Sequence, residues 1–370
     1  MKAVAVYPDS RSVRVIDAPD PQLKGPGCVK LRILEVGVCG TDREISRFEY
    51  GQPPAGNDHL IIGHESLGEV VETGPQVSDL KAGDLAVLTV RRPCQQAACV
   101  ACRAGRQDFC YTGRYTERGI KGRHGYMAEM AADEHQYAVG VPPELRDVAV
   151  LTEPLTIAEK AIEEVGRIQQ RLPWGLPGRD GRPTYRHKAV VVGAGPVGLL
   201  GAMALAVRPF EVHVYSREPA DDPRAGIAKA IGAVYHCSRE VQMDDLAGDL
   251  GNIDLVYEAT GAAQVSFDML AQLGVNAVFI LTGVPGENNP IRLDGGGLMR
   301  NMVLRNQVLL GSVNAPRKAY DDAVADLVTF MRNWPEAVRG VITDRHPIDD
   351  APDVLTGKGE GIKTVIRPGG

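Results

Sequence analysis

The stretch V-V-V-G-A-G-P-V-G at 190–198 decides how the second half of the chain folds. Three valines lead into Gly193, and helix formers fill 199–205, so the stretch predicts a strand, a glycine turn and the start of a helix. A dinucleotide site needs this order: Gly193 permits the tight turn, Gly195 lets the backbone approach a pyrophosphate, and Gly198 lets the helix pack close to the strand. The pyrophosphate then lies on the helix N-terminus.

A charge-free run over 189–207 surrounds this stretch and is long enough to be considered as a membrane span. Glycines at 193, 195, 198 and 201, with Pro196, divide it into a strand-length half and a helix-length half. Strand-like segments also follow at the spacing that a doubly wound sheet requires. We therefore interpret the run as a coenzyme-binding strand and helix.

The composition narrows the class of protein and its partners. A chain of 370 residues suggests two domains, and a net charge of −6 favours neither a nucleic acid nor an anionic membrane as a partner. The start of the chain has only a short apolar run before Pro8, so no signal peptide is expected and the predicted location is cytoplasmic.

The predicted secondary structure changes along the chain, from a strand-rich first part to a part that begins with a helix. Residues 1 to about 150 contain short β-branched runs at 29–36, 68–72 and 85–90, typical of a barrel-like domain of antiparallel strands. Helical character begins near Pro154, and a Pro/Gly-rich connector of unusual length follows at 172–186.

From His187 onward, strand candidates alternate with helical stretches, which indicates a parallel sheet covered on both faces. A predicted helix at 318–331 and a strand at 364–366 are too few for a third domain and are expected to return to the N-terminal domain. The strand candidates lie at 211–215, 233–235, 253–257, 276–281 and 308–310.

Two short motifs indicate a catalytic metal site, C-G-T-D at 39–42 and G-H-E at 63–65. The thiolate of Cys39 and the neutral imidazole of His64 are both good zinc ligands, and a catalytic zinc takes three protein ligands and leaves one position open. No cysteine lies between 110 and 237, so the third ligand is expected to be a carboxylate.

Glu153, in the run T-E-P at 152–154, is the candidate for that third ligand. The alternative is an ordinary acidic residue in the first turn of a helix capped by Thr152, where it suits the helix dipole without any metal. Cys39 and His64 have structural alternatives too, as a buried apolar cysteine and a hydrogen-bonded core histidine. The residues alone leave these alternatives open.

A second metal site is indicated by four of the seven cysteines, which are separated by gaps of four, two and seven residues. Four thiolates so close in sequence can close a tetrahedral shell, and a closed shell is structural because no position remains for substrate. The alternative, reduced thiols on a surface loop, is prone to oxidation. The four are Cys94, Cys99, Cys102 and Cys110.

The end of the second coenzyme strand bears on coenzyme choice. An NAD site places an acid there for the ribose 2′-hydroxyl, whereas a 2′-phosphate needs a cation and small polar groups. Ser216 and Arg217 occupy this place, which favours NADP, and Glu218 follows. The alternative is that Arg217 is solvated and Glu218 binds the ribose.

Taken together, these motifs resemble the zinc-containing medium-chain dehydrogenases over nearly the whole chain, and within them the glucose 1-dehydrogenases. The resemblance implies an α/β fold in which a Rossmann doubly wound parallel sheet domain is inserted in a GroES-like β-barrel catalytic domain. The stretches specific to the glucose enzymes are T-V-R-R-P at 89–93, T-E-R-G-I-K-G at 116–122, H-G-Y-M-A-E at 124–129, E-P-L-T-I-A-E-K-A at 153–161 and G-S-V-N at 311–314.

The implied domains are a catalytic domain over 1–154, with a structural zinc lobe at 91–112, a coenzyme domain over 155–314 and a C-terminal return over 315–370. The first cysteine gap is four residues where the family commonly has two. The backbone is therefore expected to bulge before Cys99, and Cys94 is the least certain ligand of the lobe.

The resemblance also implies roles for individual residues. Glu153 matches a glutamate that faces the catalytic zinc, and Glu65 matches one used as a ligand or as a close carboxylate. Thr41 matches the hydroxyl that touches the reacting oxygen. Glu117 and Asn314 match residues that hold sugar hydroxyls.

The implied coenzyme contacts come from three parts of the chain: the glycine turn, the end of the second strand, and two segments along the nicotinamide half. These residues are Gly193, Gly195, Pro196, Val197, Gly198, Ser216, Arg217, Thr282, Gly283, Val284, Ser312, Val313 and Asn314.

The function implied is zinc-dependent oxidation of an aldose, D-glucose at C1, to the lactone, with hydride transfer to NADP or also to NAD. Two zinc ions per chain are expected, one catalytic and one structural. An NAD-dependent polyol dehydrogenase of the sorbitol type is the alternative enzyme, galactose or xylose are alternative aldoses, and a non-catalytic coenzyme-binding protein is the alternative class. The family suggests a homodimer or homotetramer.

Overall fold

The computed structural model describes residues 1–370 except 174–186, 287–289, 360 and 370, so most of the predicted connector at 172–186 lies outside the described residues. The chain forms two compact units. Unit 1 comprises Met1–Thr156, Asn314–Val328 and Ile342–Gly370, and unit 2 comprises Ile157–Val313 and Thr329–Val341. Among the described residues, no helix is long and apolar enough to cross a membrane.

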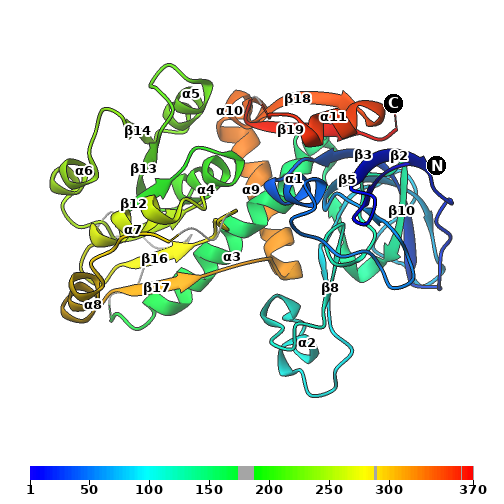
Figure 1. The fold of residues 1–370 in the computed structure, drawn as a ribbon, viewed down its shortest axis with the longest axis horizontal. Helices are drawn as coiled ribbons and strands as arrows, with labels where there is room; N and C mark the ends of the chain where they lie inside the picture. Colours follow the sequence, from blue (N-terminus) through cyan, green and yellow to red (C-terminus); the bar gives the residue numbers. More distant parts are fainter. Residues whose placement is uncertain (174–186, 287–289, 360, 370) are drawn as a thin grey trace. The chain divides into compact units, whose positions relative to one another are not determined.

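Unit 1 is built on a seven-stranded sheet with the strand order β11-β6-β5-β3-β19-β18, in which β10 also pairs with β3. Most of these pairs are antiparallel, and the last strand of the chain, β19, lies between β3 and β18 (Figure 1). The strands are β3 (Cys28–Gly37), β5 (Glu65–Thr73), β6 (Leu85–Leu88), β10 (Met130–Glu134), β11 (Ala138–Val141), β18 (Ile342–Pro347) and β19 (Lys363–Arg367).

Two three-stranded sheets complete the strands of unit 1. One holds β1 (Lys2–Tyr7), β2 (Ser12–Asp17) and β4 (Leu60–Ile61), and the other holds β7 (Arg91–Arg92), β8 (Thr116–Arg118) and β9 (Gly122–Arg123). The core of unit 1 is mainly aliphatic and includes Leu31, Ile33, Ile62 and Val70. The short helices are α1 (Gly40–Ser46), α2 (Val100–Arg103) and α11 (Ala351–Thr356).

Unit 2 is a six-stranded parallel sheet with the order β14-β13-β12-β15-β16-β17. The valines of β12 are buried on both faces, as expected for a central parallel strand. The strand order reverses between β12 and β15, which creates a topological switch point there. The strands are β12 (His187–Val192), β13 (Phe210–Ser216), β14 (Val234–Cys237), β15 (Leu255–Glu258), β16 (Val278–Leu281) and β17 (Val308–Gly311).

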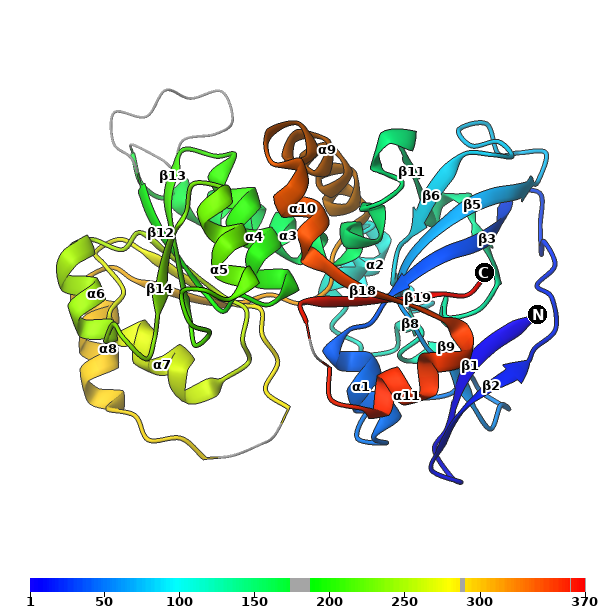
Figure 2. The same cartoon turned by 90° about the horizontal axis from the view of Figure 1, so that it is seen from above.

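Helices cover both faces of this sheet (Figure 2). One face packs α6 (Met243–Leu250), α7 (Ala263–Ala271) and α8 (Gly295–Leu304) over a core that includes Val190, Val256 and Phe279. The other face carries α4 (Pro196–Ala206) and α5 (Pro223–Ala230), which α10 (Pro335–Val341) contacts. Two longer helices, α3 (Thr152–Gln169) and α9 (Arg317–Asn333), contain two of the four positions where the chain passes from one unit to the other.

The predicted elements are present, with ends shifted by a few residues. For example, the strand expected at 276–281 is β16 (Val278–Leu281), and the helix expected at 318–331 is α9. The predicted return of 364–366 is the pairing of β19 with β3. Unit 2, however, takes Thr329–Val341, whereas the predicted boundary assigned all of 315–370 to the first domain.

Candidate active site and coenzyme-binding site

The glycine turn of unit 2 has the geometry that a dinucleotide site requires. Gly193 has φ +101°, and a Cβ on Gly198 would overlap the carbonyl oxygen of Gly193, so α4 begins directly against the turn. A Cβ on Gly195 would meet nothing within 4 Å, which leaves open space in front of its backbone. Pro196 is the first residue of α4, where its missing N–H is harmless. A pyrophosphate fits this arrangement.

Ser216, the last residue of β13, forms a hydrogen bond with this turn. Its Oγ accepts a hydrogen bond from the Ala194 backbone N–H (3.1 Å) and donates to the Glu218 carboxylate (2.5 Å). The Arg217 side chain is 84% exposed and its Nε lies 3.2 Å from Glu218 Oε1. The exposed guanidinium is available to an anion, while Glu218 lies close enough to compete with it.

The two segments predicted along the nicotinamide half follow β16 and β17. Thr282 donates its hydroxyl to the Glu258 carbonyl (2.6 Å), Ser312 N–H donates to Leu281 O (2.9 Å), and Lys160 Nζ donates to Val313 O (2.8 Å). These bonds place both segments at the carboxyl edge of the sheet, where open α/β sheets bind ligands.

In unit 1, Asp42 joins the two predicted metal-binding motifs. Its buried carboxylate accepts from Cys39 N–H (2.9 Å) and from Gly63 N–H (3.1 Å), and it lies 3.4 Å from His64 Nδ1. Burial alone would lower the pKa of His64, but the Asp42 carboxylate outweighs it and the pKa is raised well above its ordinary value. Thr41 lies two residues after Cys39, in α1, and is partly accessible.

The possible ligand atoms of Cys39, His64 and Glu65 all lie within 4.8 Å of one another. The side chain of Glu65 is also engaged elsewhere, in a buried ion pair with Lys363, which donates to Val38 O as well (3.0 Å). A Cβ on Gly37 would overlap the Glu65 carboxylate, so glycine is needed there. A partly accessible thiol beside a buried imidazole and a buried carboxylate fits a zinc ion.

Glu153 lies in the first turn of α3, partly accessible, and its charge interacts with those of His64 and Glu65. Burial raises the pKa of Glu153 to about 7, an effect that His64 opposes and Glu65 reinforces. Glu153 is not in the group of ligand atoms that lie within 4.8 Å of one another. In the alternative interpretation of Glu153, Thr152 caps the helix; its hydroxyl instead donates to Ala149 O (2.7 Å) of the 3₁₀ turn that precedes α3.

The two residues predicted to hold sugar hydroxyls meet in unit 1. Asn314 Nδ2 donates to Glu117 Oε1 (3.2 Å), although the two are far apart in sequence. Glu117 is buried and also pairs with Arg91, whose guanidinium lies 2.9 Å from the same oxygen. Arg91 in turn stacks on Tyr115, with 3.8 Å to the ring centroid. The pair offers a sugar both a carboxylate and an amide.

The four clustered cysteines are also brought together. Their Sγ atoms all lie within 4.8 Å of one another, in a lobe of unit 1 that carries α2 (Figure 1). The predicted bulge before Cys99 is a turn in which Cys99 N–H donates to Gln96 O (3.0 Å), and it leaves Cys94 within the cluster. Four thiols in this arrangement fit a tetrahedral zinc ion.

Comparison with known proteins matches a family model to each of the two main parts of the chain. Residues 25–143 match the family described as alcohol dehydrogenase GroES-like domain, and residues 146–367 match glucose dehydrogenase C-terminus. Glucose 1-dehydrogenase of Methanocella arvoryzae is 38% identical over 370 residues, which is 100% of both chains. The chain belongs to the glucose 1-dehydrogenase family.

Other members of the family support the same placement among the zinc-containing medium-chain dehydrogenases. Glucose 1-dehydrogenase 2 of Vulcanisaeta moutnovskia is 39% identical, over 99% of both chains. The structure of Haloferax mediterranei glucose dehydrogenase in complex with NADP, Zn and gluconolactone has a TM-score of 0.85 and 32% identity, again over 99% of both chains.

Three residues that support the site in this family member were not predicted to have a role. Asp42 carries a sequence signal, because it is the last residue of the C-G-T-D motif. Arg91 carries one too, because it lies in the stretch T-V-R-R-P at 89–93, although its partner Glu117 is found only in the structure. Lys363 carries none, because it is identified only by the carboxylate that it meets, that of Glu65.

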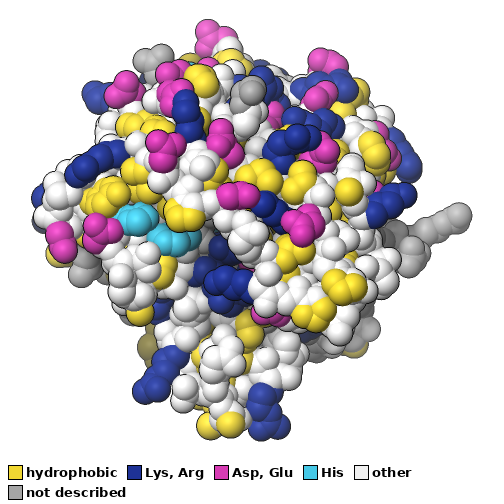
Figure 3. Space-filling view, turned by 90° about the vertical axis from the view of Figure 1, so that its right-hand side faces the viewer, with side chains coloured by type: hydrophobic (Ala, Val, Ile, Leu, Met, Phe, Trp, Pro, Cys, Tyr) yellow, Lys and Arg dark blue, Asp and Glu magenta, His cyan; other side chains and the backbone are white. Residues whose placement is uncertain are grey.

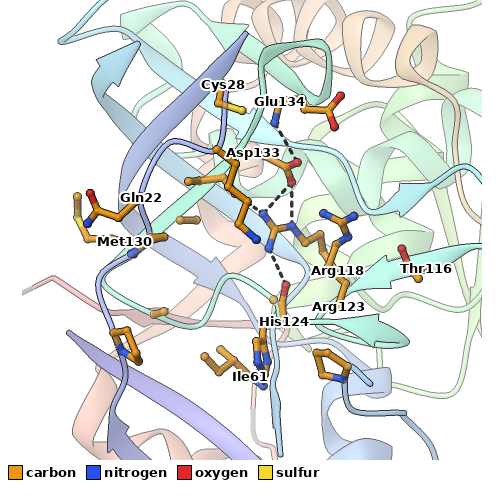
Figure 4. Close-up of a pocket in the computed structure, with 18 of the residues that line it drawn as sticks. Gln22, Cys28, Ile61, Thr116, Arg118, Arg123, His124, Met130, Asp133 and Glu134 are labelled. Atoms are coloured by element: carbon orange, nitrogen blue, oxygen red, sulfur yellow. Dashed lines mark hydrogen bonds and ion pairs between the residues drawn. The ribbon is translucent and has the colours of Figure 1, made fainter. Parts of the chain in front are cut away.

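A large pocket, about 1130 Å³, lies elsewhere on unit 1 and is lined by none of the predicted site residues. Asp133 in its lining pairs with Arg118 (2.8 Å) and also with Arg92 (2.6 Å), and Arg118 donates to the His124 carbonyl oxygen as well (2.9 Å; Figure 4). Figure 3 shows acidic and basic side chains interspersed over one face of the molecule. We assign no ligand to this pocket.

Proposed function

We propose that this protein oxidises D-glucose at C1 to the lactone and transfers the hydride to NADP, with NAD as a second coenzyme. The observation that carries the proposal is the grouping of Cys39, His64 and Glu65 in a chain that matches glucose 1-dehydrogenases over its full length. The Haloferax relative was solved in complex with NADP, Zn and gluconolactone.

Cys39, His64 and Glu153 are the proposed ligands of a catalytic zinc. Glu65 is the alternative third ligand, but its ion pair with Lys363 favours a role beside the metal. Asp42 faces Nδ1 of His64 and so orients the ring, as carboxylates commonly do for ligating histidines. Zinc held here supplies a Lewis acid for the C1 hydroxyl, and the coenzyme accepts the hydride.

The remaining steps use side chains of unit 1. The Thr41 hydroxyl, two residues after Cys39, would take the proton of the C1 hydroxyl and pass it toward solvent. Glu117 would accept hydrogen bonds from sugar hydroxyls and the Asn314 amide would donate to them. Because Arg91 holds the Glu117 carboxylate in place, the sugar meets an already oriented acceptor.

The four clustered cysteines, Cys94, Cys99, Cys102 and Cys110, are the proposed ligands of a second, structural zinc. Their shell would be closed, so this zinc would stabilise the lobe without touching substrate. The proposed content is therefore two zinc ions per chain.

For the coenzyme, the glycine turn would bind the pyrophosphate of NADP and Arg217 its 2′-phosphate. Glu218 lies 3.2 Å from Arg217 Nε and disfavours a second anion nearby, which would leave room for NAD. Arg217→Ala should raise the KM for NADP several-fold and leave the KM for NAD nearly unchanged. An equal effect on both coenzymes would contradict this role.

We also propose that the chain acts in the cytoplasm as a homodimer or homotetramer. Unit 2 exposes apolar side chains on α8, with Met299 70%, Val303 67% and Leu304 64% exposed. The neighbouring β17 is an edge strand of the sheet, and among the described strands none pairs with its outer side. Light scattering of the purified protein measures its mass in solution, and a monomer would contradict the proposal.

The activity is tested by mixing the zinc-loaded protein with D-glucose and either coenzyme and following absorbance of the reduced coenzyme. We expect rapid, chelator-sensitive reduction of NADP. Cys39→Ser should abolish turnover and lose one zinc per chain, while the matched control Cys28→Ser, a buried cysteine outside both clusters, keeps both. Activity only on polyols with NAD would identify the sorbitol-type alternative.

A further inference from the structure

Glu258, the last residue of β15, is a fully buried carboxylate with an unusual set of partners. Its Oε1 accepts hydrogen bonds from Thr260 N–H (2.6 Å), Thr260 Oγ1 (2.6 Å) and Gly261 N–H (2.9 Å). Its Oε2 accepts from Gly283 N–H (3.2 Å). Within the part of the chain that the structure describes, no ion pair of Glu258 is found. Four neutral donors therefore offset the cost of burying its charge.

The donors belong to two loops that lie too close together for side chains. A Cβ on Gly283 would overlap Gly261 N, and Gly261 has φ +66°. The second loop is held at its start as well, because Thr282 N–H and Oγ1 both donate to the Glu258 carbonyl (3.1 and 2.6 Å). Glu258 thus joins the loop after β15 to the loop after β16.

This junction lies beside the glycine turn. Thr260 Cγ2 occupies the space where a Cβ on Gly193 would come, at 2.6 Å. The strand order reverses between β12 and β15, so Glu258 stands at the carboxyl end of a strand that borders the switch point. Open α/β sheets bind their ligands outside the strand ends at this position.

We propose that Glu258 is a positioning residue that holds the loops at 260–261 and 282–284 as one preformed surface for the nicotinamide half of the coenzyme. The proposal rests on the proposed coenzyme-dependent function. A carboxylate is needed because both of its oxygens face donors and it presents no donor of its own. Preforming the surface avoids the cost of ordering the 282–284 loop when coenzyme binds.

The test variant is Glu258→Gln. Its oxygen can still serve the three donors of residues 260 and 261, but its amide N–H₂ must then face Gly283 N–H, so the 282–284 loop is released selectively. We expect the Kd for oxidised coenzyme, measured by calorimetric titration, to rise about tenfold. Hydrogen exchange at 283 and 284 should accelerate, while zinc content stays unchanged.

The matched control is Asp254→Asn, just before the opposite end of β15. Asp254 accepts from Lys188 N–H (2.9 Å) of β12 and from Asn252 Nδ2 (2.8 Å), so its loss also removes a carboxylate that joins two segments of unit 2. It should lower the unfolding midpoint without changing the Kd for coenzyme. An equal rise in Kd for both variants, or no rise for Glu258→Gln, would overturn the proposal.

Two further outcomes are distinguishable. If Glu258→Gln does not fold, Thr260→Val removes the hydroxyl that donates to Glu258 Oε1 (2.6 Å) and accepts from Ala262 N–H (2.9 Å), and it should raise the Kd in the same direction by a smaller factor; an unchanged Kd would overturn the proposal. A wild-type protein that binds coenzyme but does not oxidise glucose would contradict the proposed substrate alone. A wild-type protein that binds neither NADP nor NAD would overturn both.

Discussion

Lys363 and Glu65 form a buried ion pair beside the proposed zinc ligands, and both side chains are about 3% exposed or less. Removing one member of such a pair leaves an uncompensated charge, whereas replacing both with apolar residues is often nearly neutral. Single and double substitutions in this pair therefore test whether it stabilises the region around the proposed zinc ligands.

We predict that Lys363→Met lowers the free energy of unfolding by about 3 kcal/mol. The reason is that the Glu65 carboxylate stays buried without its cation. The double variant Lys363→Met with Glu65→Leu should recover most of that loss. Urea unfolding of both variants measures the effect, and a double variant as unstable as the single one would contradict the pairing argument.

His124 makes the stability of unit 1 depend on pH. Its Nδ1 accepts from Ile61 N–H (3.1 Å), its ring stacks on His59, and its backbone carbonyl accepts from Arg118. Burial, followed by the nearby His59 and Arg118, lowers the pKa of His124 to about 4. A neutral ring is therefore part of the folded structure.

Because the folded pKa lies below the ordinary value of 6.5, the unfolded chain takes up the proton first, and stability falls as pH drops from about 6.5 toward about 4. Allowing for partial exposure, we expect His124 to account for about 1 kcal/mol of loss between pH 7.5 and 5. His124→Asn keeps an acceptor for Ile61 N–H and should remove this pH-dependent loss of stability. If the wild type and His124→Asn lost the same stability between pH 7.5 and 5, the loss could not be assigned to His124.

At the scale of elements, the glycine turn and α4 depend on the absence of side chains. A Cβ on Gly198 would overlap Gly193 O, so the first turn of α4 would have to move away from β12. Gly226 is exposed in the middle of α5, and a Cβ added there would meet nothing within 4 Å. Replacing glycine with alanine is therefore expected to have opposite effects on stability in α4 and in α5.

We predict that Gly198→Ala destabilises the protein by about 1–3 kcal/mol and weakens coenzyme binding at least tenfold. Gly226→Ala should instead stabilise it by about 0.5–1 kcal/mol, because alanine is the better helix former, with coenzyme binding unchanged. Thermal unfolding and coenzyme titration measure both effects. Equal behaviour of the two variants would contradict the close packing at Gly198.

At the scale of the whole molecule, unit 1 is completed by residues from both ends of the chain. The chain leaves unit 1 after Thr156 and returns at Asn314, and β19 then pairs with β3 on one side and β18 on the other. The last strand also carries Lys363 to Glu65. The proposed metal site therefore requires the C-terminal segment.

We predict that deleting residues 363–370 prevents unit 1 from folding, because the sheet loses an interior strand and Glu65 loses its cation. Deleting Gly369 and Gly370 alone should be tolerated. Soluble yield, circular dichroism and zinc content distinguish the two chains. A folded, zinc-containing protein after the longer deletion would contradict this dependence.

Much of the fold could be predicted because its signals are local in sequence. The turn at 193–198 is determined by which residues lack a Cβ, and the strand and helix on either side by their immediate composition. The four cysteines of the lobe lie within a short stretch of chain that can wrap around one ion. The alternative in which Thr152 caps the helix does not allow for the 3₁₀ turn before α3, whose Ala149 carbonyl accepts the Thr152 hydroxyl.

Only the tertiary structure could decide which distant segments of the chain are in contact. The pairing of Glu117 with Asn314 and Arg91, of Glu65 with Lys363, and of Glu258 with Gly283 depends on how strands from different parts of the chain are ordered. Local sequence sets backbone conformation through sterics and side-chain periodicity. Which buried charges meet is settled only when packing removes them from water and each must find a partner.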